Sequence, residues 1–439
     1  MVEYDDGWIQ LIEDRVACDT RMLRTYNIRC SESVDGHLRR YQFAAGRYDL
    51  SQQVWLPPRV IIVGAATPNM VGDPRYRLDI SAQTLFMATR KGCPRSLTRN
   101  QMPWPVPEVW PSVPIKCVRK GFLMNDNTTV RDINGQGLEE EGGGYTKQGM
   151  PNSYAGLDGG GFFELPGCIN TFAAGGTCGR RADPAYHGEG GDHGTKFVTG
   201  AGRGVSNVLI EDVRLNDLSG EASMSAFWSA MAPDDSAHRN ITFRRIVSMR
   251  TARDGINVHG NVVGWTGEDL HFEDCGDDVF AVWGAGGGDD VDQTGFDPPY
   301  VKCRLTNRPA TDVVFRRVFA KPGGSWSSCS HVFGSGRVLF DEMLCCHTTK
   351  QDWSYPALTV DSTFCPSYKD AAITFRQLRW FDYNANDLCL VGGTKKGPVV
   401  ANPHQGDSTG WSNNYLHIRD LSCGIPKPFD SERNLTESA

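Results

Sequence analysis

The amino-acid sequence predicts an all-β fold, in which short parallel strands wind into one solenoid with long loop insertions. Three observations support this class. The 439 residues include 49 glycines and 24 prolines, which describes a turn-rich chain and argues against a helical bundle. Segments rich in β-branched and aromatic residues recur from residue 200 onward, with polar or glycine turns between them. No helical period of 3.6 residues persists in that half of the chain.

Most of the recurring segments follow one plan: a polar or glycine turn, a short β-rich strand, a polar pair and then an apolar residue. They are residues 206–213, 239–246, 311–318, 337–340 and 372–378. Their steps are uneven, with 33 residues from Val208 to Ile241 and 25 from Val313 to Val338. Uneven steps are typical of solenoid coils whose loops bulge outward, and they argue against a propeller with fixed blades.

The predicted solenoid spans residues 45–425. Residues 1–44 are expected to form an N-terminal cap or a remnant of a preceding segment, and residues 426–439 a C-terminal tail. The stretch 45–64 reads as a turn, a short edge strand, a proline break and a buried apolar strand that ends at Gly64. Residues 70–200 carry Pro-rich and Gly-rich runs with little periodicity. We interpret them as long loops inserted into the early coils.

Charge and hydropathy exclude several kinds of partner. The net charge of −7 argues against nucleic acid or anionic membrane as a partner. No run of about 18 apolar residues exists, so we expect no membrane span. The first six residues are acidic and contain no apolar signal-peptide core, so the protein is either intracellular or has its targeting segment outside this chain. We expect a monomer.

Cysteine usage favours a secreted protein. Fourteen cysteines lie between Cys18 and Cys423, and no CxxC pair suggests zinc. We interpret them as disulfide staples across loops, with buried thiols in the coils as the alternative. Glycosylation sequons begin at Asn127, Asn240 and Asn434, which is compatible with secretion.

Two short stretches carry the candidate chemistry. Residues 252–260 contain Asp254, and residues 275–283 contain Asp277 and Asp278; each places a carboxylate beside glycine ahead of an apolar run. Asp254 and Asp277 are 23 residues apart, a plausible single solenoid coil. Strands on successive coils stack about 4.8 Å apart, so the three carboxylates would crowd one patch. Crowding pushes the pKa values of carboxyl groups apart, and a proton-holding carboxyl beside an ionised one suits glycosidic-bond hydrolysis.

These stretches resemble the catalytic core of glycoside hydrolase family 87, the α-1,3-glucanases and mycodextranases. Its "D-G-I-N-x-H-G" strand matches residues 254–260. Its "G-D-D-G-[IV]-A-x-W" strand resembles residues 276–283, with Val279 in place of the glycine after the paired aspartates and Phe280 in place of the Ile or Val. The opening around residues 46–64 is similar to the start of pectin-lyase-like β-helices. The resemblance implies a right-handed parallel β-helix, endo-type hydrolysis of α-glucan and inversion at the anomeric carbon.

The candidate catalytic residues are therefore Asp254 as the acid, with Asp277 or Asp278 as the base. An inverting pair is expected to lie about 6.5–9.5 Å apart. Strand alternation places Asn257 and His259 on one face, where they could reach a sugar hydroxyl. Trp265 and Trp283 could contact a pyranose ring, although a solenoid also buries tryptophans.

No cofactor and no bound metal are expected, with calcium as the one ion to consider. Adjacent aspartates on neighbouring coils offer the oxygen ligands that calcium takes, and Asp277-Asp278 could serve in that way. The acidic loop that holds Asp289, Asp290 and Asp292 could bind calcium, supply a further carboxylate or be solvated.

Two alternatives to a neutral-glucan hydrolase remain open. A polygalacturonase-like hydrolase would also pair aspartates after glycine, but it needs a "G-H-G" coil, to which Ser330-His331-Val332 is the nearest approach. Residues 254–300 contain no lysine or arginine to bind uronate carboxylates, which favours a neutral polysaccharide as substrate. A non-catalytic carbohydrate-binding or cell-wall structural β-helix is the second alternative, because Val279 and the lack of a further carboxylate one coil downstream depart from the family pattern.

Overall fold

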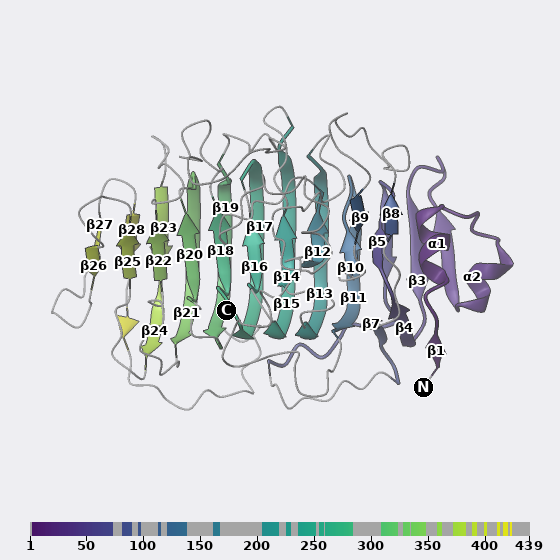
Figure 1. The fold of residues 1–439 in the computed structure, drawn as a ribbon, viewed down its shortest axis with the longest axis horizontal. Helices are drawn as coiled ribbons and strands as arrows, with labels where there is room; N and C mark the ends of the chain where they lie inside the picture. The colour runs from purple at the N-terminus through teal and green to yellow at the C-terminus, as the bar shows by residue number, and fades with distance from the viewer. Residues whose placement is uncertain are drawn as a thin grey trace.

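The computed structural model is a parallel β-helix, which confirms the predicted fold class. It describes residues 2–72, 81–89, 95–97, 113–115, 121–137, 161–166, 204–218, 225–229, 236–251, 254–258, 260–283, 309–323, 328–333, 335–347, 358–361, 372–382, 389–392, 399–401, 411–412, 416–419 and 422–423. Figure 1 shows the strands stacked side by side along one long axis, with the N-terminal segment at one end.

Most strands of the described chain belong to two long sheets. The first has 17 strands: β1 (Glu3–Tyr4), β2 (Ile28–Glu32), β3 (Arg39–Phe43), β4 (Gly46–Leu50), β6 (Val60–Val63), β7 (Thr84–Ala88), β11 (Thr129–Gln136), β13 (Ser206–Leu218), β15 (His238–Thr251), β17 (Val262–Cys275), β19 (Thr311–Pro322), β21 (Arg337–His347), β23 (Ala372–Arg376), β24 (Arg379–Asp382), β27 (Trp411–Ser412), β28 (Leu416–Arg419) and β29 (Ser422–Cys423). Its long strands β11, β13, β15, β17, β19 and β21 pair in parallel in that order.

The second sheet has ten strands: β5 (Gln53–Trp55), β10 (Gly121–Leu123), β12 (Gly161–Leu165), β14 (Ser225–Ser229), β16 (Ile256–Val258), β18 (Phe280–Trp283), β20 (Ser330–Phe333), β22 (Leu358–Asp361), β25 (Cys389–Gly392) and β26 (Val399–Ala401). They follow chain order, and all pairs are parallel except β25 with β26. Strands β8 (Arg95–Leu97) and β9 (Val113–Ile115) form a separate antiparallel pair.

Part of the stretch 70–200, which the sequence analysis interprets as inserted loops, consists of β-strands that belong to the turns of the solenoid. Strands β7, β10, β11 and β12 lie within residues 70–200 and take places in the two long sheets. Three of them are five residues or shorter, and such short runs between glycines show no clear periodicity in the sequence.

The polar pair of each repeat forms a corner inside the long strands. The second residue of the pair adopts a left-handed backbone with φ between 52° and 57°, as at Asp212, Arg245, Asp269 and Arg317. This conformation turns the chain between two β segments, and it is uncommon for residues other than glycine. The first residues of these pairs stand in register on successive coils, and so do the second residues.

We call this set of stacked polar pairs the corner ladder. Its first residues alternate in sign along the stack: Arg131, Glu211, Arg244, Glu268, Arg316, Asp341 and Arg376. Ion pairs join neighbouring coils, with Arg316 Nη1 3.0 Å from Glu268 Oε1 and Arg376 Nε 2.8 Å from Asp341 Oδ1. The second residues pair as well, because Arg317 Nε lies 2.6 Å from Asp269 Oδ1. These contacts satisfy charges that the corners bring together.

An aromatic stack fills the inside of the coils. The ring centroids of Phe315 and Phe340 are 4.6 Å apart with an interplanar angle of 1°, and those of Phe340 and Phe375 are 4.8 Å apart. The ring of Trp265 lies next to this stack, with its centroid 4.7 Å from that of Phe315 and its plane tilted by 44°. Gly267 stands in register between Phe243 and Phe315, and the indole of Trp265 occupies the space that a side chain there would take.

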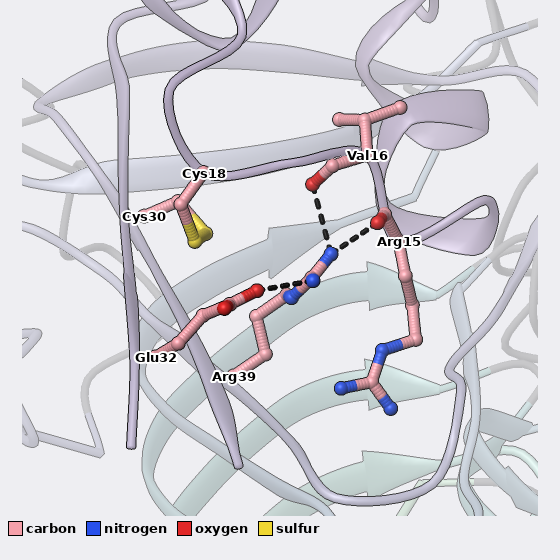
Figure 2. Close-up of a disulfide and its surroundings, with 6 residues drawn as sticks. All are labelled: Arg15, Val16, Cys18, Cys30, Glu32 and Arg39. Carbon is pink, nitrogen blue, oxygen red and sulfur yellow. Dashed lines mark hydrogen bonds and ion pairs between the residues drawn. A yellow bond between two sulfur atoms is a disulfide. The ribbon is translucent and has the colours of Figure 1, made fainter. Parts of the chain in front are cut away.

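The N-terminal segment lies at one end of the solenoid (Figure 1). Helices α1 (Trp8–Glu13) and α2 (Arg21–Thr25) lie here, and Trp8, Ile9 and Ile12 are buried in the core. Strands β1 and β3 pair with β4 and β6, so the sheet runs through residue 45 without a break. Cys18 and Cys30 form a disulfide in this segment, as Figure 2 shows. Cys275 and Cys345, by contrast, are thiols buried in the core. Within the described residues, no helix has the length and apolar character to cross a membrane.

Candidate active site

Asp254 and Asp278 occupy equivalent positions on successive coils. Strand β16 pairs with β18 in parallel, with Ile256 opposite Phe280, and each aspartate lies two residues ahead of its strand. The backbone between them is also bonded, because Gly255 N donates to Asp278 O at 2.9 Å. Asp277 precedes Asp278 in the same turn. The structure therefore brings the three predicted carboxylates together, with one oxygen from each lying within 4.8 Å of the others.

The next coil continues this column with a serine. Strand β20 pairs with β18, with Ser330 opposite Phe280, and Ser328 lies two residues ahead of β20. The Ser328 amide donates to Asp278 Oδ1 at 2.9 Å, and Val279 N donates to Ser328 O at 2.9 Å. A serine thus stands one coil downstream of the paired aspartates, in the position that follows Asp278 in the stack.

The side chains of the three aspartates are largely buried, although each lies in a turn just before a strand. Asp254 and Asp278 are each 5% exposed, and Asp277 is half-buried. Hydrogen bonds hold all three carboxyl groups: Asn257 Nδ2 donates to Asp254 Oδ2 at 2.7 Å, Asp278 N donates to Asp277 Oδ1 at 3.1 Å, and Ser328 N donates to Asp278 Oδ1 at 2.9 Å. Like charges this close repel, so a shared proton or a bound cation would lower the energy of the group.

Asn257 lies on the face of the sheet that points away from the core, as the alternation predicts. Its strand neighbours Ile256 and Val258 belong to the core cluster, whereas Asn257 does not. The side chain is only 1% exposed, and within the described residues its Oδ1 has no hydrogen-bond partner. A buried carbonyl oxygen of this kind can accept a hydrogen bond from a ligand hydroxyl at little further cost.

The site contains a histidine that the sequence analysis did not include among its candidates. His331 stands two coils from Asn257 in the same row, because Asn257 pairs with Ala281 and Ala281 with His331. Nδ1 of His331 lies 2.6 Å from Asp278 Oδ2, and the residue is 5% exposed. The signal was the strand alternation around Ser330-His331-Val332. Its position one coil after the paired aspartates follows from the pairing of β18 with β20, which the sequence alone does not show.

The other predicted substrate contacts have different outcomes. Trp265 is fully buried among Phe243, Phe315 and Gly267, so the structure corrects its proposed role to a core residue. Trp283 ends strand β18, but its side chain lies outside what the structure describes. His259 and the acidic loop with Asp289, Asp290 and Asp292 also fall outside the described residues.

Comparison with known proteins gave structural matches only. No family model matches the chain, and no curated protein matches it. Solved structures similar to it include the catalytic domain of a family-87 α-1,3-glucanase in complex with nigerose, at 14% identity and a TM-score of 0.40. That match covers 87% of this chain and 45% of the glucanase chain, so this chain spans less than half of that length.

Two further matches come from other enzyme families. The A-module of a mannuronan C-5 epimerase from Azotobacter vinelandii matches at 11% identity and a TM-score of 0.36, covering 97% of this chain and 98% of that one. A family-28 exopolygalacturonase from Yersinia enterocolitica matches at 12% identity and a TM-score of 0.33, covering 96% and 64%.

Proposed function

We propose that the protein is a glycoside hydrolase that cleaves a neutral α-glucan, α-1,3-linked, at Asp254, Asp277 and Asp278. The observation that carries this proposal is the convergence of three carboxylates from two successive coils to within 4.8 Å. Hydrolysis of a glycosidic bond needs one carboxyl to protonate the leaving oxygen and a second carboxylate on the other side of the bond.

The hydrogen bonds support a division of roles among the aspartates. Asp278 faces two nitrogen atoms, the amide of Ser328 and Nδ1 of His331, and these contacts hold its carboxyl group in a fixed orientation from which it can orient water. Asn257 Nδ2 donates to Asp254 Oδ2 and holds this carboxyl group in place, and we assign Asp254 as the acid. Asp277, the least buried of the three, is the base that takes a proton from water.

The stereochemical outcome is a separate question. The resemblance to family 87 implies inversion, which usually leaves about 6.5–9.5 Å between the carboxyl groups. Here the nearest carboxylate oxygens lie within 4.8 Å of one another, closer to the separation typical of retaining enzymes. We propose inversion, and proton NMR of the first-formed anomer checks it; retention would identify a covalent intermediate.

The first prediction tests catalysis directly. Asp254→Asn and Asp277→Asn should each lower kcat at least about 100-fold, the lower end for general acid–base groups. Reducing-sugar release from a panel of α-1,3-, α-1,4- and β-linked glucans measures the effect. Asp19→Asn, an exposed change on the N-terminal segment, is the matched control. Wild-type turnover in both site variants would place the active site elsewhere, and a wild-type protein that binds these glucans without cleaving them would indicate a non-catalytic β-helix.

One observation favours a second candidate function. His331 stands one coil after the paired aspartates, the place where a polygalacturonase-like enzyme would carry the histidine of its "G-H-G" coil. Polygalacturonate in the same substrate panel separates the two functions. We place the neutral glucan first because no lysine or arginine occurs between residues 254 and 300.

We also propose that the protein is secreted and acts as a monomer without a cofactor. The Cys18–Cys30 disulfide supports an oxidising compartment, where such bonds persist. Calcium bound among the three aspartates is the alternative to a cofactor-free site, and hydrolysis measured with and without a chelator distinguishes them.

A further inference from the structure

A cationic hollow lies where the N-terminal segment meets the first coils. Its volume is about 550 Å³, within the usual range for small-molecule sites. Four basic side chains line it, those of Arg15, His37, Arg39 and Arg59, against one carboxylate, that of Asp126. None of these residues belongs to the candidate active site, so the hollow is a separate feature of the molecule.

The Arg39 side chain is already paired with groups of the protein, so it forms part of the lining of the hollow and does not contact a ligand. Its guanidinium pairs with Glu32 and donates to the backbone oxygens of Arg15 and Val16, the latter at 2.8 Å (Figure 2). The Cys18–Cys30 disulfide joins the same backbone segment to strand β2. Together these contacts hold the main chain of Arg15 in place from two directions.

Arg15 and Arg59 are the two arginines of the hollow whose guanidinium groups can bind an anionic ligand. Arg15 Nη1 donates to the backbone oxygen of Pro58 at 3.2 Å, and neither arginine has a carboxylate partner among the described residues. The Arg59 side chain is exposed and has no hydrogen-bond partner among those residues. His37 is exposed as well, and its own backbone amide donates to Asp35 Oδ1 at 3.0 Å.

The backbone beneath Arg59 is fixed. Arg59 adopts a left-handed conformation with φ of 60°, its amide donates to Asp126 O at 2.8 Å, and its carbonyl accepts from Arg39 N at 3.0 Å. These bonds tie the turn after β5 to the turn after β10 and to strand β3. Both arginines therefore extend from backbones that are held before any ligand arrives, which reduces the ordering cost of binding.

We propose that this hollow binds a small molecule that carries an oxyanion, with Arg15 and Arg59 gripping the anionic group. Guanidinium groups match the planar, two-pronged geometry of carboxylate and phosphate oxygens. Asp126 lies at the same hollow, where its Oδ1 accepts a hydrogen bond from Ser206 N at 2.8 Å, and its carboxylate favours an anion that also carries hydroxyl groups, as an acidic sugar does. The oxyanion is therefore the carboxylate of an acidic sugar or free inorganic phosphate.

Ligand-dependent thermal unfolding of the full chain tests this proposal. The probes are sodium glucuronate, inorganic phosphate and uncharged glucose, each titrated in Tris buffer at constant ionic strength. A ligand that binds only the folded state raises the unfolding temperature in a saturable way. The variants are Arg15→Gln and Arg59→Gln, and Arg29→Gln is the control because Arg29 is exposed on β2, outside the hollow, and carries the same charge.

The proposal expects a saturable rise with glucuronate or phosphate and none with glucose. Arg59→Gln and Arg15→Gln should raise the half-saturating concentration at least about tenfold, the equivalent of 1.4 kcal/mol, while Arg29→Gln leaves it unchanged. Tighter binding of glucuronate identifies an acidic sugar, and tighter binding of phosphate identifies the free anion. An equal response to glucose, or equal behaviour of Arg59→Gln and Arg29→Gln, would overturn the proposal. Reducing-sugar release is measured separately, so failure here leaves the hydrolase proposal intact.

Discussion

At the scale of single residues, the coil stack lets side chains act on partners that are distant in sequence. Asp278 meets His331, 53 residues downstream, because β18 and β20 are neighbours in the sheet. We infer that His331 is a positioning residue, since its contact is with Asp278 and it acts through that carboxylate. Such a residue keeps a reacting group in its productive orientation and costs rate when it is lost.

The second prediction concerns this pair. His331→Leu removes both ring nitrogens and should lower kcat about tenfold or more with little change in KM, because water positioning rather than substrate binding is lost. In an Asp278→Asn background the same change should have little further effect, since the pair acts as a unit. Additive losses in the double variant would show that His331 works through another contact.

The third prediction concerns the core residue that was mistaken for a substrate contact. A Cβ at Gly267 would lie 2.7 Å from Cη2 of Trp265 and 2.7 Å from Cδ1 of Leu270. Gly267→Ala should therefore destabilise the fold by about 1–3 kcal/mol, the usual cost of overpacking. Combining it with Trp265→Phe, which frees space, should cost less than the sum of the two single changes. Urea unfolding measures all three variants, and strict additivity would contradict the packing argument.

Trp265 also shows what the sequence could and could not settle at this scale. The spacing of Asp254 and Asp277 was enough to predict that the carboxylates lie together. Residues one coil apart in the sequence lie next to each other on neighbouring strands. The Trp265 side chain points into the core, where Gly267 leaves room for its indole. This packing depends on the neighbouring coils, so the sequence alone did not predict it. His331 was missed for a related reason, because it follows Asp278 by 53 residues, whereas Asp278 follows Asp254 by only 24, so the coil spacing does not predict its position.

At the scale of elements, the repeat of short strands was predictable, whereas the corners were not. The polar pair of each repeat was visible in the sequence, but its left-handed backbone and its place in a stack were not. Asp341 illustrates the energetic consequence. The hydrogen bond from Arg376 lowers the pKa of Asp341, against the opposing effect of burial and with added attraction from Arg376 and Arg316.

The fourth prediction follows from that lowered pKa. The ordinary value is 3.8, so the contribution of Asp341 to stability is full above that pH and is lost as pH falls through the lowered pKa of the folded state. Asp341→Asn should cost about 1 kcal/mol at neutral pH, because Arg376 is partly exposed and solvent weakens the pair. It should also flatten the acid limb of the stability curve below that value. Thermal unfolding across pH, with Asp19→Asn as control, measures this; an unchanged acid limb would mean that Asp341 is not stabilised by its partners.

At the scale of the whole molecule, stability is built from neighbour contacts along one axis. Each coil contacts chiefly the coils before and after it, so the free energy of unfolding is close to a sum of coil terms and interface terms. The N-terminal end carries helices, buried aromatic residues and a disulfide, and it also holds the cationic hollow. Ligand binding there would act on the first coils, at a distance from the three aspartates.

The alternating signs of the corner ladder have a further consequence, which is a parity rule for the number of coils. Removing the coil that carries Arg244 would place Glu211 against Glu268, two like charges, whereas removing the coils of both Arg244 and Glu268 would place Glu211 against Arg316. The fifth prediction is that a two-coil deletion unfolds at a higher temperature than a one-coil deletion, although it loses more of the core. The reverse order would show that core burial outweighs the ladder.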